Sequence, residues 1–258
     1  IKIRLILPFI LMRIFTGNLS EAEYFIRTRQ DTLKTPNLPP LALIAFKNLE
    51  AFYCWMSGDF ETCRNVVEKG RDLAADIGIQ ITSAFLSIHG AAGALSSGDL
   101  EKAREHLQAA AKYVSKESNA VSELFHTISV WQALLEGGAA KALLHAEIAM
   151  DYAADTGMPF SAAASHLGYA LALHASNKTT EADRALHKAI LIARRSNTRP
   201  IEFAAYLAQA EFAIDHGHET KARDFLKNAM ATGNFHQFFN TWFWRPAQMV
   251  RLCCKALE

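Results

Sequence analysis

Residues 98–110 read GDLEKAREHLQAA, and variants of this stretch return about every 40 residues along the 258-residue chain. The related stretches are FTGNLSEAEYFI, SGDFETCRNVV, SGDLEKAREHL, EGGAAKALLHA, ASNKTTEADRAL and DHGHETKARDFL. Each contains one landmark residue, and the six landmarks are Gly17, Gly58, Gly98, Gly137, Asn177 and Gly217. A fixed period between about 20 and 50 residues is typical of stacked repeat proteins.

Two further positions repeat together with the landmark. The position five residues after it holds a small residue: Ala22, Cys63, Ala103, Ala142, Ala182 and Ala222. The position nine residues after it holds an apolar residue: Ile26, Val67, Leu107, Ala146, Leu186 and Leu226. Because residues four apart share one face of an α-helix, this spacing predicts a helix that makes a close contact and then a mostly larger apolar contact.

Each period divides into an apolar stretch before the landmark and a more charged stretch after it. We expect the landmark to end the first helix in the left-handed conformation. Side-chain oxygens that could cap the second helix belong to Asp59, Asp99 and Thr179 or Thr180. Prolines that suit the start of a first helix are Pro40, Pro159 and Pro200. Two helices of about 16 residues fill the period and leave no room for strands. The sequence therefore predicts an all-α fold, a right-handed superhelix of stacked antiparallel helix pairs.

Composition limits the possible function classes. The formal net charge of +1 gives no electrostatic footprint for nucleic acid or an acidic membrane. The apolar residues 1–15 are too short to span a bilayer and include Lys2, Arg4 and Arg13, so we interpret them as the first helix of the first repeat. Residues 238–258 have the pattern of a further first helix. We expect residues 1–258 to form a single repeat domain that is a fragment of a longer protein, because the sequence opens inside a repeat without an initiator Met.

The cysteines and histidines each allow two interpretations. Cys54, Cys63 and Cys253 occupy slots that hold small residues in other repeats, which favours core positions and a reducing cytoplasm. The alternative for adjacent Cys253 and Cys254 is a redox pair or soft-metal ligands, although no CxxC partner exists. His216, His218 and Glu219 cluster at one predicted turn, which indicates either a metal site or an exposed polar turn. Without HExxH spacing or a convergent third ligand we favour the exposed turn, and we expect no metal or cofactor.

Binding has a candidate surface on the first helices. Positions 15, 11 and 8 residues before each landmark share one helix face and become polar in the later repeats. We call six of these residues the polar stripe: His126, Ser129, His166, Tyr169, Tyr206 and Gln209. If stacking aligns them along a groove, they form a candidate binding site for a ligand or partner. The alternative is a solvated face or packing between repeats.

The repeat resembles the tetratricopeptide repeat (TPR) in its helix pair, its Gly-Asp or Gly-Asn turn and its small residue at plus five. It departs from that family in its longer period, in Ala51, Ala91, Ala170 and Ala210 where Gly is usual, and in the missing closing Pro. Longer repeats of this style are similar to the superhelical sensor domain of the maltose-regulon activator family, signal-transduction ATPases that regulate transcription in bacteria. The tail is similar to the end of that array, through Phe243, Trp244, Arg245, Pro246, Met249, Leu252, Cys253, Ala256, Leu257 and Glu258.

The resemblance implies a division of labour. An ATPase switch and a DNA-binding domain would lie outside this chain, and the superhelix would receive a small-molecule inducer or a partner protein. Tetratricopeptide domains that clamp carboxylates need Lys, Asn and Arg at the positions 10 and 6 before the landmark, where this chain has residues such as Thr127, Trp131 and Leu171. That comparison makes the face with positions 10 and 6 concave, whereas the polarity argument makes the polar stripe concave.

Two main function classes follow from the sequence. The first is a non-catalytic sensor and interaction domain of a transcriptional regulator, and the second is a stand-alone scaffold or peptide-binding adaptor. A third class is an enzyme built on a helical toroid, which needs a convergent cluster of acid, base or metal-binding residues. The sequence has no such cluster in view, and the GxxxxGK[ST], GxSxG and GxGxxG motifs are absent. We therefore expect no enzyme activity and no binding of nucleic acid or membrane by this chain, with the oligomeric state left open.

Overall fold

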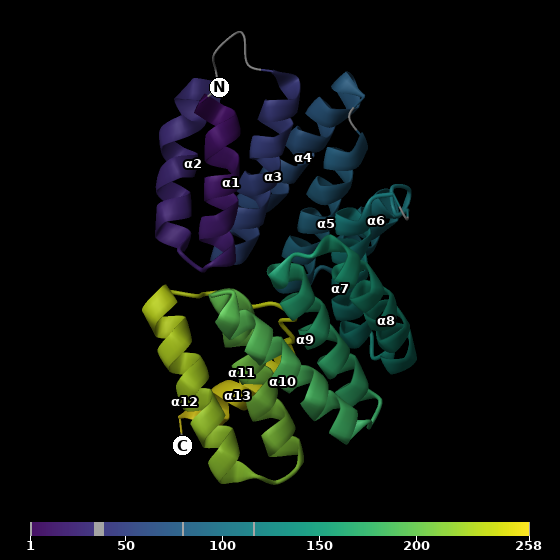
Figure 1. The fold of residues 1–258 in the computed structure, drawn as a ribbon, viewed down its shortest axis with the longest axis vertical. Coiled ribbons are helices and arrows are strands. Elements are labelled where there is room, and N and C mark those ends of the chain that lie inside the picture. The colour runs from purple at the N-terminus through teal and green to yellow at the C-terminus, as the bar shows by residue number, and fades with distance from the viewer. Residues whose placement is uncertain (1, 34–38, 79, 116, 258) are drawn as a thin grey trace. The chain divides into compact units, whose positions relative to one another are not determined.

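The computed structural model describes residues 2–33, 39–78, 80–115 and 117–257, and within them every regular element is a helix (Figure 1). The predicted all-α class is confirmed. The helices of these described ranges are α1 (Lys2–Phe15), α2 (Leu19–Leu33), α3 (Pro40–Ser57), α4 (Phe60–Ile77), α5 (Gln80–Ser97), α6 (Leu100–Ala111), α7 (Asn119–Leu135), α8 (Ala139–Thr156), α9 (Pro159–Ala175), α10 (Thr179–Arg195), α11 (Arg199–Asp215), α12 (Glu219–His236) and α13 (Pro246–Ala256).

The landmarks separate the two helices of each pair, as predicted. All six have positive φ, from 57° at Asn177 to 85° at Gly58 and Gly98. This left-handed conformation costs Gly little because it has no Cβ, and Asn tolerates it better than most residues. Each landmark therefore ends a first helix and turns the chain back for the second.

The two repeating slots form the contacts between helices. The residues at plus five are at most 1% exposed, and those at plus nine are at most 5% exposed. Cys63 shows how close the contact is, since its Sγ lies 3.5 Å from the carbonyl oxygen of Ala51 on the paired helix. Interiors are packed to crystal-like density, so a small residue at plus five sets the approach of the two helices.

Caps and prolines explain where several helices begin. Asp59 accepts a hydrogen bond from the amide of Thr62 at 3.1 Å, and Asp99 accepts one from Lys102 at 2.9 Å, as expected. The expected Thr cap of α10 is wrong, because Lys178 occupies the cap position without a side-chain bond and Thr179 is already the first helical residue. Pro40, Pro159 and Pro200 stand at the first or second helical position, as predicted.

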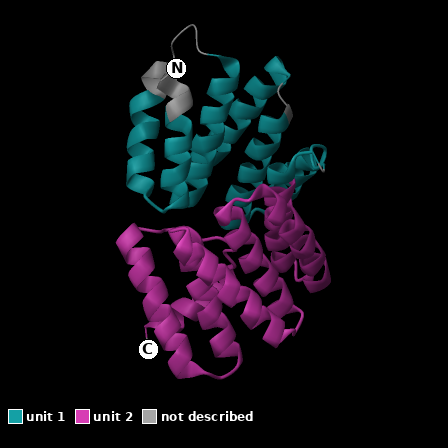
Figure 2. Ribbon diagram, viewed as in Figure 1, with its two compact units in different colours: residues 1–121 teal, residues 122–258 magenta. Residues whose placement is uncertain are grey.

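The chain groups into two compact units, residues 1–121 and 122–258 (Figure 2). In the first unit α1, α3 and α5 are successive neighbours, each paired with the helix that follows it. Its core includes Trp55 and Phe46, both fully buried, and the ring of Phe52 stacks on His89 at 5.0 Å. Burial lowers the pKa of His89 to about 3, so this histidine packs as a neutral aromatic ring.

The second unit repeats the arrangement, with α9, α11 and α13 as successive neighbours. A cluster of Phe203, Leu207, Leu226 and Leu252 joins α11, α12 and α13. The predicted further first helix thus exists, but it begins at Pro246 rather than at Phe238. Residues 237–245 are not helical. The physical reason is Pro246, which disfavours the α conformation at Arg245, where φ is −130° and ψ is 109°.

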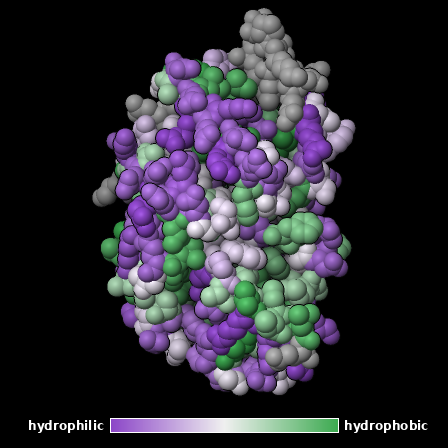
Figure 3. All heavy atoms as spheres, turned by 180° about the vertical axis from the view of Figure 1, so that it is seen from behind, coloured by the Kyte–Doolittle hydropathy of each residue, from purple (hydrophilic) through white to green (hydrophobic). Residues whose placement is uncertain are grey.

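The four cysteines divide into a buried pair and an exposed pair. Cys54 and Cys63 are buried as predicted, whereas Cys253 and Cys254 are exposed, so the core interpretation of Cys253 is wrong. The face in Figure 3 carries groups of hydrophobic residues separated by hydrophilic ones. Among the described helices, none combines the length and the apolarity that crossing a membrane requires.

Candidate functional site

The polar stripe of the second unit lies on α7, α9 and α11, and most of it is buried. His126, Ser129, His166 and Tyr206 are at most 9% exposed, while Tyr169 and Gln209 are partly exposed. The contacts of the buried members explain this difference.

His126 packs against the second helix of its own pair. Its Nδ1 lies 2.9 Å from Nδ1 of His145 on α8, and its ring stacks on that of Tyr152 at 6.0 Å. Burial, and then the neighbouring His145, lowers the pKa of His126 to about 4. The two imidazoles are therefore neutral at pH 7, with one Nδ1 donating and the other accepting.

Ser129 and His166 are also turned away from solvent. The Ser129 hydroxyl donates to the carbonyl oxygen of Phe125 at 2.8 Å, within its own helix. Burial, and then the charge of Lys188, lowers the pKa of His166 to about 4, and its buried Nδ1 has no hydrogen-bond partner among the described residues.

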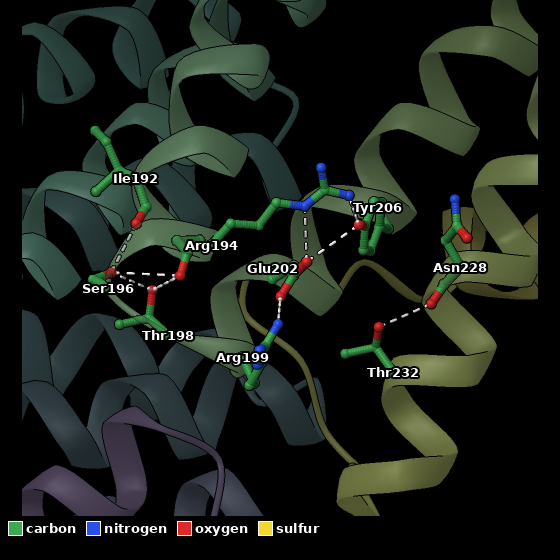
Figure 4. Close-up of polar contacts among 10 residues, drawn as sticks. Ile192, Arg194, Ser196, Thr198, Arg199, Glu202, Tyr206, Asn228 and Thr232 are labelled. Carbon is green, nitrogen blue, oxygen red and sulfur yellow. Dashed lines mark hydrogen bonds and ion pairs between the residues drawn. The ribbon is translucent and has the colours of Figure 1, made fainter.

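Tyr206 belongs to a charged network at the end of the stripe (Figure 4). Its hydroxyl donates to Glu202 at 3.2 Å and accepts a hydrogen bond from Arg194. Glu202 also accepts from Arg194 Nε at 3.0 Å and from Arg199 at 2.6 Å. Two guanidinium groups thus pair with the buried carboxylate of Glu202. Tyr206 belongs both to this charged network and to the hydrophobic cluster of α11 and α12.

A hollow of about 550 Å³ lies beside this network. Its lining residues are Asn197, Arg199, Ala231, Thr232, Phe235 and His236. The Thr232 hydroxyl donates to the carbonyl oxygen of Asn228 at 2.9 Å, so its hydrogen bond stays within its own helix (Figure 4).

A different face of α7, α9 and α11 is covered by residues 237–245, which we call the tail segment. It connects α12 to α13, and in Figure 1 it is a yellow loop that passes beside α9. We call the face beneath it the tail face and define it by Trp131 on α7, Gly168 on α9 and Glu211 on α11. Trp131 and Glu211 occupy the position 6 residues before their landmarks, so this is the face that the tetratricopeptide comparison singled out.

The tail segment contacts all three helices of the tail face. The indole N–H of Trp131 donates to the carbonyl oxygen of Trp244 at 2.7 Å. A Cβ added to Gly168 would lie 2.8 Å from Cζ of Phe243, so the ring occupies the space that a side chain would fill. Arg245 forms an ion pair with Glu211, which is 3% exposed.

A buried carboxyl group lies on the same helices. Glu123 Oε1 accepts hydrogen bonds from Ser165 at 2.8 Å and from Thr127 at 2.9 Å. Burial raises the pKa of Glu123 to about 7, against the opposing effect of these hydroxyl donors. The group therefore takes up a proton at a higher pH than an exposed glutamate does.

Three possible metal ligands meet next to the tail segment, namely His174, Glu211 and Asp215. Their carboxylates are already paired, because Glu211 binds Arg245 and Asp215 binds both Arg251 and His174, the last at 2.7 Å. Burial alone would raise the pKa of Asp215, but the bonds from His174 and Arg251 hold it below its usual value. Both carboxylates thus accept from a guanidinium group, of Arg245 in the tail segment and of Arg251 on α13. This arrangement suits ion pairs that hold these segments on α11 better than it suits a cation site.

Sequence reasoning pointed to the stripe and, through the tetratricopeptide comparison, to the tail face, but it missed the tail segment that covers this face. The structure brings His126, His166 and Tyr206 onto the same set of helices, yet it joins them to neighbouring helices through His145 and Arg194. The tail segment was missed because its apolar pattern resembles that of the first helices. Pro246 was the signal that could have revealed the break.

Solved structures resemble this chain in fold. A Rap protein complexed with competence and sporulation factor has a TM-score of 0.67 and 14% identity, over 92% of this chain and 67% of its own. The apo form of RapI has a TM-score of 0.61 and 14% identity, over 93% and 67%. Aspartyl phosphate phosphatase F from Bacillus subtilis has a TM-score of 0.59 and 13% identity, over 98% and 78%.

The sequence comparisons add no family. No protein-family model matches the chain, and no curated protein matches its sequence. The structural likeness confirms the TPR-like helical repeat.

Proposed function

We propose that this chain is the non-catalytic sensor and interaction domain of a bacterial signal-transduction ATPase that regulates transcription. Residues 1–258 act as a single repeat domain of a longer cytoplasmic protein, and the domain binds a partner protein or a small-molecule inducer. The ATPase and DNA-binding functions belong to other domains. The maltose-regulon activator type of sensor is the family expectation that this proposal carries forward.

The observation that carries the proposal is the tail face. It holds a non-helical polypeptide by three contacts. The indole of Trp131 donates a hydrogen bond to the main chain of the segment, an aromatic ring packs on Gly168, and an arginine pairs with Glu211. Peptide-recognition surfaces combine the same three kinds of contact, with backbone bonds for affinity and side-chain contacts for specificity. A surface that already holds a segment of this kind suits protein interaction.

The titratable groups support a non-catalytic role. Burial raises the pKa of Cys63 to about 12 and raises that of Cys54 further, so neither thiol forms a nucleophilic thiolate at pH 7. His126 and His166 have lowered pKa values for the same reason, and both pack as neutral rings. A general base needs a pKa near the working pH and access to a substrate. Glu123 has such a pKa but is only 3% exposed, so no substrate reaches it.

The polar stripe remains a second proposed binding surface. Tyr169 and Gln209 are the two members that a ligand reaches without moving a helix, because the other four are buried. With an inducer in hand, alanine at Tyr169 or Gln209 should weaken its binding while the melting temperature stays unchanged. Unchanged affinity in both variants would place the inducer elsewhere.

The proposal predicts that the isolated chain binds neither ATP nor DNA. Thermal melts with Mg·ATP, and anisotropy with a labelled duplex at low salt, should show no shift and no salt-dependent binding. The flanking gene sequence should encode a P-loop upstream and a DNA-binding helical domain downstream. Flanks without these domains would favour the alternative of a stand-alone scaffold or peptide-binding adaptor. ATP protection, or tight salt-dependent binding of the duplex, would contradict the prediction that this chain binds neither.

A further inference from the structure

The tail segment is buried to a degree that connecting segments seldom reach. Asn240, Thr241, Trp242 and Phe243 are between 2% and 5% exposed, although none of them is helical. Loops usually run over the surface, because a buried loop has to satisfy its own backbone polar groups. These four residues are instead enclosed like the side chains of a bound ligand.

Two aromatic residues of the segment, Trp242 and Phe243, each meet a particular residue of the first helices. Trp242 packs edge-on against Phe160 at the start of α9, with ring centroids 5.5 Å apart. Phe243 lies over Gly168, and its ring is 6.3 Å from that of Trp131. Gly168 is a helical glycine with ordinary negative φ, so its value here is the space it leaves for the ring rather than its backbone freedom.

The end of the segment is held by polar contacts. The Trp244 carbonyl oxygen accepts from Trp131 at 2.7 Å, and the next residue, Arg245, pairs with Glu211. Both carboxylate and guanidinium are largely buried, with side-chain exposures of 4% and 16%. A buried charge needs such a partner, so the face is selective for a cation at this position.

The backbone of the segment is held in an uncommon conformation. Phe243 has φ of 57°, in the left-handed region that residues with bulky side chains avoid. Such a conformation is unfavourable for a bulky residue and persists only where the surroundings enforce it. Contacts on the tail face therefore hold the segment against its local preference, and a partner without this conformation would bind with less strain.

We infer that the tail segment is an internal ligand of the tail face, and that a partner displaces it. The partner is a non-helical protein segment with consecutive aromatic residues followed by arginine, the chemistry that Trp242, Phe243, Trp244 and Arg245 present. This inference rests on the proposed interaction function and names the class of partner. A tether at both ends gives the internal ligand an effective concentration of about millimolar, so a partner binds strongly only when the tail is released.

The test uses the full chain and a fluorescein-labelled hexapeptide with the sequence of residues 240–245, NTWFWR. The release variant carries Phe243→Ala and Arg245→Ala, which remove the two contacts with Gly168 and Glu211. Phe239→Ala is the matched control, because Phe239 belongs to the same segment but is 78% exposed. Fluorescence anisotropy should show that the release variant binds the hexapeptide at least tenfold more tightly than the natural chain and the Phe239→Ala variant.

Two further variants make the result specific. Glu211→Gln in the release background should weaken hexapeptide binding at least fivefold, and a hexapeptide ending in Glu should bind no variant. If circular dichroism shows that the release variant has lost helix, Arg245→Ala alone replaces it and should give a smaller gain in the same direction.

Equal, weak binding by the folded release variant and the natural chain would overturn the inference and make the tail segment a fixed structural plug. That result leaves the proposed function intact, since a partner could still bind the polar stripe. The proposed function fails separately, if the chain binds ATP or its flanks lack an ATPase.

Discussion

Single residues set the close packing of the repeats. The small residues at plus five and the left-handed landmarks were predicted from sequence because each is a local requirement that recurs six times. The buried Glu123 was not predicted, because its partner Ser165 lies 42 residues away and only the fold brings them together. Local pattern thus revealed backbone and packing constraints, and missed polar pairs between helices.

Enlarging the residue at plus five should overpack the helix contact. We expect Ala103→Leu and Ala182→Leu each to lower the free energy of unfolding by about 1 to 3 kcal/mol, since both side chains are fully buried. Ala154→Leu is the control, because Ala154 is exposed on α8. Urea melts measure the difference, and unchanged stability in both buried variants would contradict the predicted registration.

The charge of Glu123 should cost stability at high pH. Its folded pKa of about 7 exceeds the usual 4.5, so the folded state binds more protons and stability falls as pH rises from about 4.5 through 7. Glu123→Gln keeps an oxygen for Ser165 and Thr127 and removes the charge. We expect it to stabilise the chain by about 1 to 3 kcal/mol at pH 8 and by less at pH 5.

The measurement for Glu123→Gln is a pair of denaturant melts of both proteins, at pH 5 and pH 8. Because the buried histidines are common to both proteins, their own pH dependence cancels in the comparison. A variant that is less stable at pH 8 than the natural chain would show that the charged carboxylate is well solvated.

At the scale of elements, helix limits follow from caps and prolines. Asp59 and Asp99 cap α4 and α6 as the sequence predicted. The boundary of α13 was predicted wrongly, because apolar periodicity continues through the tail segment although Pro246 forces extended backbone before it. Apolar periodicity indicates which residues are buried, and in the tail segment these residues are buried without forming a helix.

Removing a cap should weaken its own helix. Asp99→Ala should lower the free energy of unfolding by about 0.5 to 2 kcal/mol, because the amide of Lys102 loses its acceptor. Asp72→Ala, on an exposed position inside α4, should not destabilise, since alanine is the better helix former there. Equal effects of the two substitutions in thermal melts would argue against the cap.

At the scale of the molecule, the repeat architecture was predictable and the burial of the polar stripe was not. The period alone indicated stacked helix pairs, which the structural neighbours confirm. The polar stripe was inferred from polarity, but polar side chains also satisfy one another between helices, as His126 does with His145 and Tyr206 with Glu202. Whether a polar face is open therefore depends on partners far along the chain, which sequence periodicity does not report.

That the tail face holds a polypeptide segment is tested most directly by fluorine NMR of the full chain labelled with 5-fluorotryptophan. Substituting each of the four tryptophans in turn by Phe assigns the signals. Trp242 is 2% exposed, so the chemical shift of its fluorine signal should be almost the same in H₂O and in D₂O. In the release variant, the difference between the two solvents should become as large as that of free 5-fluorotryptophan. A full solvent shift for Trp242 in the natural chain would show that the tail segment does not occupy the face.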